Sequence, residues 1–246
     1  MIDRYFQKID ELLNEVYTTQ KAAMEEAATM IAQATTSGHS LFAFGCSHSS
    51  LLIQDIYYRA GTFMLVNPLF GPGMSLSNDF PPTKTSAMER MPGLAEVILK
   101  ESPVQAGDVL LVVSTSGRNR VPVEMVREAK VRGLRVIALT SRPYSAAVAS
   151  QDPAGAHVDA LADVVIDNRA PVGDAALAVE GLPAPIGPVS SVIGTAILHA
   201  VMARVAEQWL EMGMAPPVYL SGNLEEGPEY NRRMLDKYRA AIHYLP

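Results

Sequence analysis

Three consecutive hydroxyl side chains stand directly after an apolar segment of the chain. Residues 108–113, Asp-Val-Leu-Leu-Val-Val, have the composition of a strand that is buried on both faces. Ser114, Thr115 and Ser116 follow it, and the apolar spacing beyond Asn119 predicts a helix. Unpaired N–H groups at a helix N-terminus carry partial positive charge, and with hydroxyl donors beside them they bind phosphate. The turn therefore predicts a phosphate site; the alternative is that Ser116 only caps the helix.

A second serine-rich turn, Cys46-Ser47-His48-Ser49, follows the apolar segment 41–45. His48 is as well explained by packing within the turn as by contact with a ligand. Cys46 has no activating base beside it in the sequence, so we interpret it as a small residue that fits a tight turn. Ligands of parallel sheets bind beyond the carboxyl ends of the strands, and both serine-rich turns are expected there.

Strands and helices alternate along the first two thirds of the chain. This alternation predicts βαβ units and a parallel sheet. Five strands predict an α/β fold, a doubly wound sheet of flavodoxin-like order flanked by helices. The prolines of residues 67–84 predict an irregular segment. We expect a long amphipathic helix over 2–36, strands over 41–45, 62–66, 108–114, 134–140 and 162–167, and shorter helices over 51–60, 91–101 and 143–150.

The last third of the chain differs from the rest in composition. Residues 170–188 are rich in proline and glycine, and a loop of this length in a compact domain is usually functional. Ser190 and Ser191 are expected to cap a long helix that ends near residue 212. We find no repeat and no domain boundary, so we expect one domain over 1–246, with its N-terminal helix at about 2–36, its core sheet at about 41–167 and its C-terminal helices at about 190–242.

The composition restricts the class of protein and of ligand. The net charge of −6 argues against nucleic acid and anionic membranes as partners. No apolar run reaches membrane-spanning length, the first residues are too charged for a signal peptide, and we expect a cytoplasmic protein. The single cysteine cannot form an internal disulfide. His157, Asp159 and Asp163 lack the coherence of a metal site, so we expect neither a metal nor a cofactor.

These residues resemble the SIS (sugar isomerase) domain family. Residues 41–49 look like the first phosphosugar loop of SIS domains, 113–119 like their second, hydroxyl-rich loop, and 188–191 like their third contact region. The resemblance covers about residues 1–246. It is closest to a group of single-domain bacterial SIS proteins and more distant to phosphoheptose isomerases.

The resemblance implies a role for each matching residue. Phosphoheptose isomerases carry a catalytic glutamate on the helix after the first loop, and the aligned residue here is Arg59, so their mechanism does not transfer unchanged. SIS domains are usually dimers with shared sites, and we expect a homodimer or a dimer of dimers. The implied phosphate ligands are Ser114, Thr115, Ser116 and Asn119; the implied sugar contacts are Ser47, His48 and Ser49, with Ser190 closing the site.

Isomerisation of a sugar needs a base and an acid–base group. Glu89 is the carboxylate that we can place near the sheet edge, although an acid at the start of a helix is also often structural. Asp174 is the alternative base, and its structural explanation is a capping role in the loop. His199 lies among apolar helix residues, where a histidine is usually structural, but phosphoheptose isomerases place an acid–base histidine on the equivalent helix.

Two functions remain open from the sequence. The first is an enzyme that acts on a phosphorylated sugar or amino sugar by isomerase-type proton transfer, with deamination and epimerisation as related reactions. The second is a phosphosugar sensor or binding module without catalysis. A dinucleotide-dependent oxidoreductase is excluded because neither turn has the G-x-G-x-x-G spacing.

Overall fold

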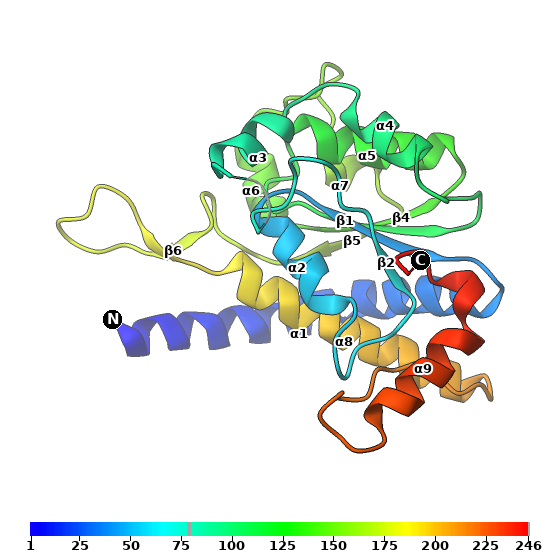
Figure 1. Cartoon of the computed structure of the whole chain (residues 1–246). Helices are drawn as coiled ribbons and strands as arrows, with labels where there is room; N and C mark the ends of the chain where they lie inside the picture. The colour runs from blue at the N-terminus through cyan, green and yellow to red at the C-terminus, as the bar shows by residue number, and fades with distance from the viewer. Residues whose placement is uncertain (78–79, 246) are drawn as a thin grey trace.

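Five parallel strands form the central sheet of the computed structural model, which describes residues 1–77 and 80–245 (Figure 1). Their order is β2-β1-β3-β4-β5. This order confirms the predicted α/β fold with a doubly wound, flavodoxin-like sheet. The strands are β1 Leu41–Gly45, β2 Val66–Pro68, β3 Val109–Val113, β4 Arg135–Thr140 and β5 Val164–Asp167.

The register of the three central strands brings their following turns together. Gly45 of β1 pairs with Val113 of β3, and Val113 pairs with Leu139 of β4. Because the strands are parallel, their carboxyl ends lie level at one edge of the sheet. The two serine-rich turns therefore lie side by side, as the sequence predicted.

Helices cover both faces of the sheet (Figure 1). On one face, helices α1, α2 and α8 build an apolar cluster with the sheet, and on the other face α4, α5 and α7 build a second cluster. No helix within the described residues is long and apolar enough to cross a membrane. The helices are α1 Ile2–Thr36, α2 His48–Ile56, α3 Thr83–Met88, α4 Leu94–Lys100, α5 Arg120–Val131, α6 Arg142–Ala147, α7 Val158–Leu161, α8 Ser190–Glu211 and α9 Gly227–Lys237, followed by a short 3₁₀ turn Arg239–Ala241.

The second strand differs from the prediction. The apolar run 62–66 was expected to be the strand, but β2 begins only at Val66. Residues 61–64 pair instead with the segment 217–219: Met64 N–H donates to Pro217 O at 2.8 Å, and Tyr219 N–H donates to Thr62 O at 3.1 Å. Most of the predicted strand therefore pairs with a segment that is distant in the sequence. Local composition gives no indication of this pairing.

Three helical predictions also need correction. Helix α2 begins at His48 rather than at residue 51, so the first serine-rich turn runs straight into it. Helix α3 begins at Thr83, inside the segment 67–84 that was predicted to be irregular, and runs on to Met88, where no element was expected. Helix α8 begins at Ser190 as expected, but neither serine caps it, because its N-cap residue is Val189.

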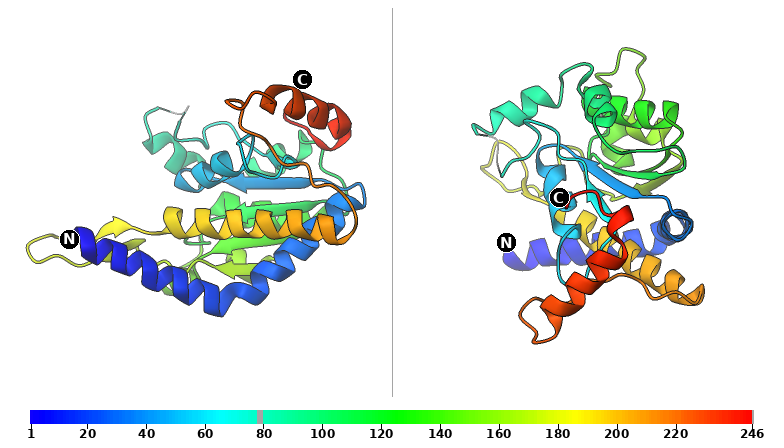
Figure 2. Two further views of the ribbon diagram at one scale, coloured as in Figure 1. Left: turned by 90° about the horizontal axis from the view of Figure 1, so that it is seen from below. Right: turned by 45° about the vertical axis from the view of Figure 1, so that its right-hand side comes forward.

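The proline- and glycine-rich loop forms a projecting arm. Its strands β6, Ala175–Leu177, and β7, Ile186–Pro188, pair antiparallel. Figure 2 shows the arm beside the first turns of α1. The Tyr5 hydroxyl donates to Pro188 O at 2.7 Å and the Arg4 guanidinium donates to Ala178 O at 3.1 Å, so the arm is fastened to α1.

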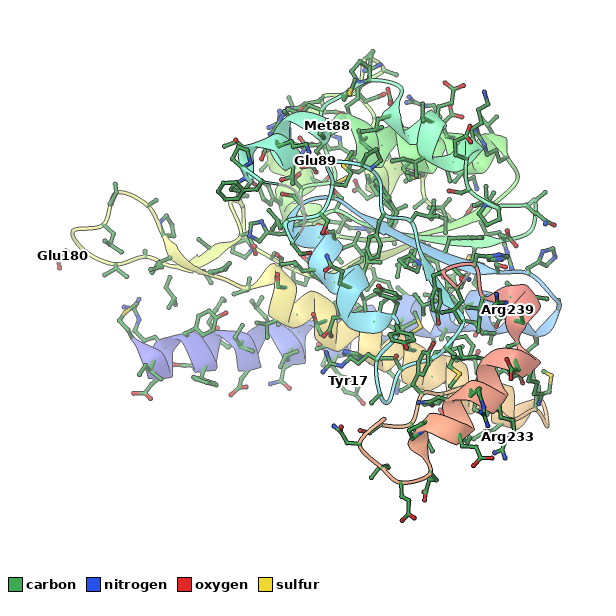
Figure 3. All side chains as sticks on the ribbon, viewed as in Figure 1. Tyr17, Met88, Glu89, Glu180, Arg233 and Arg239 are labelled. Carbon is green, nitrogen blue, oxygen red and sulfur yellow. The ribbon has the colours of Figure 1, made fainter. Side chains whose placement is uncertain are left out.

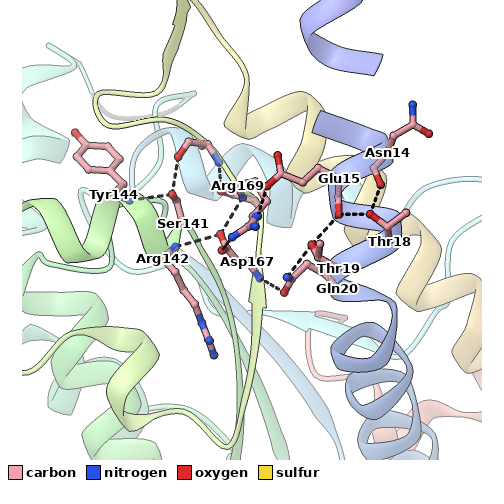
Figure 4. Close-up of polar contacts among 12 residues, drawn as sticks. Asn14, Glu15, Thr18, Thr19, Gln20, Ser141, Arg142, Tyr144, Asp167 and Arg169 are labelled. Carbon is pink, nitrogen blue, oxygen red and sulfur yellow. Dashed lines mark hydrogen bonds and ion pairs between the residues drawn. The ribbon is translucent and has the colours of Figure 1, made fainter. Parts of the chain in front are cut away.

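A polar network fastens α1 to the end of β5 (Figure 4). The Asp167 carboxylate accepts hydrogen bonds from the backbone N–H groups of Arg142 at 3.1 Å and Arg169 at 2.9 Å. The Arg169 guanidinium contacts Asp167 at 3.0 Å and Glu15 of α1 at 2.7 Å. Gln20 of α1 accepts the Asp167 backbone N–H at 3.1 Å. These bonds hold the first residues of α6 in place at the edge that carries the serine-rich turns.

An ion pair between a partly exposed guanidinium and a buried carboxylate holds the segment that follows α6 against α5. Two Arg127 nitrogens each donate to one oxygen of Asp152 at 2.9 Å, and the Asp152 side chain is fully buried. The pKa of the Asp152 carboxyl is lowered to about 2, and the hydrogen bonds from Arg127 are the largest cause of this change. Gln151, beside Asp152, donates its backbone N–H to Arg118 O at 2.9 Å, so this pair also supports the second serine-rich turn.

We predict that Asp152→Asn lowers the free energy of unfolding by about 2–3 kcal/mol at pH 7, because the folded pKa is depressed below the unfolded value of about 3.9. The stabilisation is complete above about pH 5 and is lost as the pH falls towards 2. Urea unfolding of both proteins between pH 7 and pH 3 measures it. The difference between them should shrink with falling pH, whereas exposed Asp10→Asn should match the wild type throughout; a pH-independent difference would contradict the linkage.

Candidate functional site

The second serine-rich turn presents its peptide planes in one orientation. Three of its carbonyl groups accept backbone N–H groups from neighbouring segments and therefore point away from the turn. Gly117 has φ of +61°, and a Cβ there would lie 3.0 Å from the Thr140 hydroxyl, so the turn requires glycine. The three bonds are Ser141 N–H to Thr115 O, Val158 N–H to Gly117 O and Gln151 N–H to Arg118 O, each at 2.9 Å.

The donors of the same turn are left unpaired. Among the described residues, five backbone N–H groups between Thr115 and Arg120 donate to nothing, and neither do the hydroxyls of Ser114, Thr115 and Ser116. Helix α5 begins at Arg120, its N-cap residue is Asn119, and no side chain caps it. The alternative that Ser116 is only a helix cap is therefore wrong. We call residues 114–120 the donor loop; it has the form of an anion-binding nest.

The first serine-rich turn is strained. Ser47 has φ of +54° and ψ of −124°, a conformation that costs free energy outside glycine and clusters at functional sites. A Cβ at Gly45 would lie 2.6 Å from Ser49 O, so the strand must end in glycine to turn this sharply. His48 is exposed and Ser49 is half-buried. These residues stand beside the donor loop, where the sequence predicted them.

A cavity of about 650 Å³ opens beside the first turn. The Gln54 amide on its wall donates to the Ser75 hydroxyl at 3.3 Å, and Ser75 forms a β-bridge with Ser47. Tyr58 and Phe70 supply aromatic surface to the cavity. The cavity leaves room for a molecule that extends past the first turn.

Helix α3 joins the two turns. The Thr85 hydroxyl lies 2.9 Å from the Ser47 hydroxyl in the first turn. One helical turn later, Glu89 O accepts the Val121 N–H of α5 at 3.0 Å, and the Asn119 side chain lies near enough to the Glu89 carboxyl to lower its pKa. Figure 3 shows Glu89 at the end of α3, close to the start of α2. The structure thus brings Glu89, Asn119 and Ser47 into one neighbourhood.

Burial governs the acid–base properties of this neighbourhood. It raises the pKa of the Glu89 carboxyl above its ordinary value, against smaller opposing effects from Asn119 and the charge of Arg90. Burial also raises the pKa of the Cys46 thiol well above its ordinary range, and the charge of Glu89 raises it further. Cys46 is therefore a protonated core residue and not a nucleophile, whereas Glu89 is a carboxyl suited to exchanging a proton.

His199 lies on α8, away from the two serine-rich turns, and contacts α2. Its Nε2 atom is 2.8 Å from a carboxylate oxygen of Asp55, which also contacts Arg59 one turn further along α2. No contact joins His199 to Glu89 within the described part of the chain. Asp55 lies seven residues past the start of α2, about 10 Å along the helix axis. Sequence reasoning missed Asp55, because 144 residues separate it from His199 and only the fold pairs them.

Asp174 and Ser190 contact each other. The Asp174 carboxylate accepts the Ser190 backbone N–H at 2.8 Å and the Ser190 hydroxyl at 2.7 Å. It also accepts the Val189 N–H at 3.2 Å. This is the capping role that was the structural explanation for Asp174, and it occupies the hydroxyl that was expected to close the site.

Close relatives match nearly the whole chain. A UPF0309 protein of Streptomyces coelicolor is 42% identical over 234 residues, which cover 95% of this chain and 93% of that one. A UPF0309 protein of Oceanobacillus iheyensis is 37% identical over 241 residues, 98% of each chain.

Solved structures share the fold at low sequence identity. The phosphoheptose isomerase of Neisseria gonorrhoeae aligns with a TM-score of 0.53 at 17% identity, covering 84% of this chain and 97% of that chain. The Vibrio vulnificus NanR protein complexed with ManNAc-6P aligns with a TM-score of 0.50 at 15% identity, covering 98% of this chain and 69% of that chain.

The family model described as SIS domain matches residues 4–141, which include nearly all of α1, both serine-rich turns and helix α3. This match spans more than half of the chain, and the fold agrees with it. The resemblance drawn from the two turns is confirmed: the chain is a member of the SIS domain family, and its close relatives are UPF0309 proteins.

Proposed function

We propose that this protein binds a phosphorylated sugar at the donor loop and transfers a proton on it. The observation that carries the proposal is the set of unpaired N–H and hydroxyl donors that converge at residues 114–120. Relatives in fold support the ligand class, since one is named a phosphoheptose isomerase and another is complexed with ManNAc-6P.

The donor loop is strong enough to anchor such a ligand. A hydrogen bond to a charged group contributes about 1.5–3 kcal/mol. Three or four of them offset much of the roughly 4–15 kcal/mol that association costs in lost freedom. The loop therefore fixes the phosphate, and the residues around it select the rest of the sugar.

Glu89 is the proposed base. Its carboxyl is half-buried, stands next to the donor loop through Asn119, and has a raised pKa, which brings a carboxylate closer to the pH at which it must accept a proton from carbon. His199 is the proposed acid–base group for the sugar oxygens. Asp55 would position its imidazole by holding Nε2, as carboxylates orient histidines in other acid–base sites.

One observation favours a second function, a phosphosugar sensor or binding module without catalysis. Glu89 and His199 do not touch within one chain, and Asp174, the alternative base, is occupied in capping α8. A binding module needs the donor loop alone. The two functions differ in whether the protein transfers a proton, and that difference is measurable.

We predict that Ser116→Ala weakens binding of sugar phosphates by about 1–3 kcal/mol, because it removes one donor to a charged group. The fold should be retained, since Gly117 keeps the turn. Calorimetric titration with sugar phosphates measures the change, and exposed Ser37→Ala is the control. Unchanged affinity in Ser116→Ala would exclude the donor loop as the anchor.

We predict that Glu89→Gln abolishes exchange of solvent deuterium into the carbon next to the sugar carbonyl, because the amide cannot accept a proton. His199→Asn should slow turnover by about 10²–10⁴-fold, the usual range for an acid–base group. Asp55→Asn should slow it less while leaving the fold intact. NMR of a sugar phosphate that binds the wild type follows the exchange.

The outcomes of this experiment separate the two functions. Absence of both exchange and product with wild-type protein would leave the binding module as the function for that sugar. Exchange that persists unchanged in Glu89→Gln would move the role of base to Asp174.

A homodimer is part of the proposal. Ile2 and Phe6 at the start of α1 and Ile186 on the arm are apolar and exposed, and α1 and the arm extend together from the body of the protein (Figure 2). Exposed apolar surface of this kind marks an interface. SIS domains usually pair, and a second copy is the occupant that we propose for this surface.

We predict that the wild type behaves in light scattering as a dimer or a dimer of dimers, not as a 26.5 kDa monomer. Phe6→Glu should dissociate it, because it places a charge in the apolar interface. Gln7→Glu adds the same charge at the neighbouring position and should change the mass less. A monomeric wild type at micromolar concentration would refute the proposal.

A further inference from the structure

The two sides of the candidate site differ in hydrogen-bonding character. The donor loop offers mostly backbone N–H groups and hydroxyls, and Asn119 near its end, whose side chain interacts with Glu89, adds one buried acceptor, Oδ1. Helix α3 and the residues that it contacts offer acceptors on the other side. Because a ligand must complement both sides, the acceptor side carries information about the part of the sugar that is not phosphate.

The Ser47 hydroxyl is held as an acceptor. Thr85 donates its single hydroxyl proton to Pro82 O at 2.8 Å. The hydrogen bond of 2.9 Å between Ser47 and Thr85 must then use the Ser47 proton. The oxygen lone pairs of Ser47 are left for a donor from the ligand.

Asn119 and Glu89 supply the other acceptors. The Asn119 Oδ1 atom is buried and accepts no hydrogen bond from the residues described. A buried acceptor without a partner costs free energy, which a ligand that supplies a donor recovers. The Glu89 carboxyl is half-buried, and no lysine or arginine forms an ion pair with it in the described ranges 1–77 and 80–245. The charge of Arg90 offsets the burial of this carboxyl only in part, so a ligand that brings a second cation stabilises its ionised form further.

We propose that the ligand is an amino sugar phosphate, with its phosphate on the donor loop and its protonated amino group among Glu89, Asn119 Oδ1 and Ser47 Oγ. This inference rests on the proposed function and narrows its substrate class. A hydroxyl group would bring one proton to these acceptors. An ammonium group brings three protons and a positive charge, which match the three acceptors in number and the half-buried carboxylate in charge.

Matched pairs of sugars test the inference. Glucosamine 6-phosphate and glucose 6-phosphate differ only in the amino or hydroxyl group at C2, and the mannosamine and mannose 6-phosphates form a second pair. Calorimetric titration of wild-type protein should show an affinity for one of the amino sugars at least about tenfold above its hydroxyl partner, equal to about 1.4 kcal/mol. N-acetylglucosamine 6-phosphate, which lacks the charge, should bind no more tightly than glucose 6-phosphate.

Variants assign the preference to the acceptor side. Glu89→Gln should bring the affinity ratio within a pair to about one while the hydroxyl sugar still binds. Thr85→Val frees the Ser47 proton, so Ser47 no longer acts only as an acceptor, and the affinity ratio should fall partly. This variant also tests the inference if Glu89→Gln does not fold. Ser116→Ala should weaken both members of a pair equally and keep the ratio, and exposed Glu96→Gln on α4 should change neither affinity.

The outcomes also separate this inference from the proposed function. If both members of each pair bind equally well to the wild type, the amino-sugar inference is wrong and phosphosugar binding stands. A ratio that survives in both Glu89→Gln and Thr85→Val would equally overturn it. If no sugar phosphate binds and inorganic phosphate does not bind either, the proposed function itself fails, and the inference fails with it.

Discussion

The orientation of the peptide planes in the donor loop is the constraint on which the candidate site depends. A turn presents N–H groups to a ligand only if its carbonyl groups point elsewhere and are satisfied there. Three segments distant in the sequence, at residues 141, 151 and 158, donate to those carbonyls. The Asp167 network holds the first of these segments in place (Figure 4), and the Arg127–Asp152 pair holds the second. The presentation of donors by this seven-residue loop is thus a property of the whole carboxyl edge of the sheet.

Helix α3 adds the second half of the site. It contacts the first turn through Thr85 and the second through Glu89, so it links two loops that follow neighbouring strands. The same contacts remove Glu89 from water, and burial raises its pKa. A short helix in a proline-rich segment therefore both positions the carboxyl and sets its chemistry.

The sequence predicted those features that local pattern determines. The sheet and the donor loop were predicted from three signals: continuous apolar strands, glycine at the turns and three consecutive hydroxyls. Each of these signals lies within a few residues of the chain. The start of β2 was predicted too early, because residues 61–64 pair with residues 217–219 rather than with the central sheet. Glu89 was placed near the sheet edge, but its electrostatic interactions with Asn119 and Cys46 depend on α3, which the proline-rich composition did not indicate. Asp55 and the capping role of Asp174 depend on partners outside their own segments, and no local signal exposes them.

The separation of Glu89 from His199 bears on how the fold can perform acid–base chemistry. Glu89 stands at the carboxyl edge beside the donor loop, whereas Asp55 holds His199 about 10 Å along α2. A monosaccharide bound through its phosphate at residues 114–120 meets Glu89 first. His199 lies on α8 and is partly exposed, so under the proposed function either a sugar that extends along α2 or a second copy of the chain would bring it to the same substrate. Under the proposed function, exchange of a carbon-bound proton calls on Glu89 alone, whereas acid–base work on the sugar oxygens also calls on His199, so the two steps of the reaction place different demands on the fold.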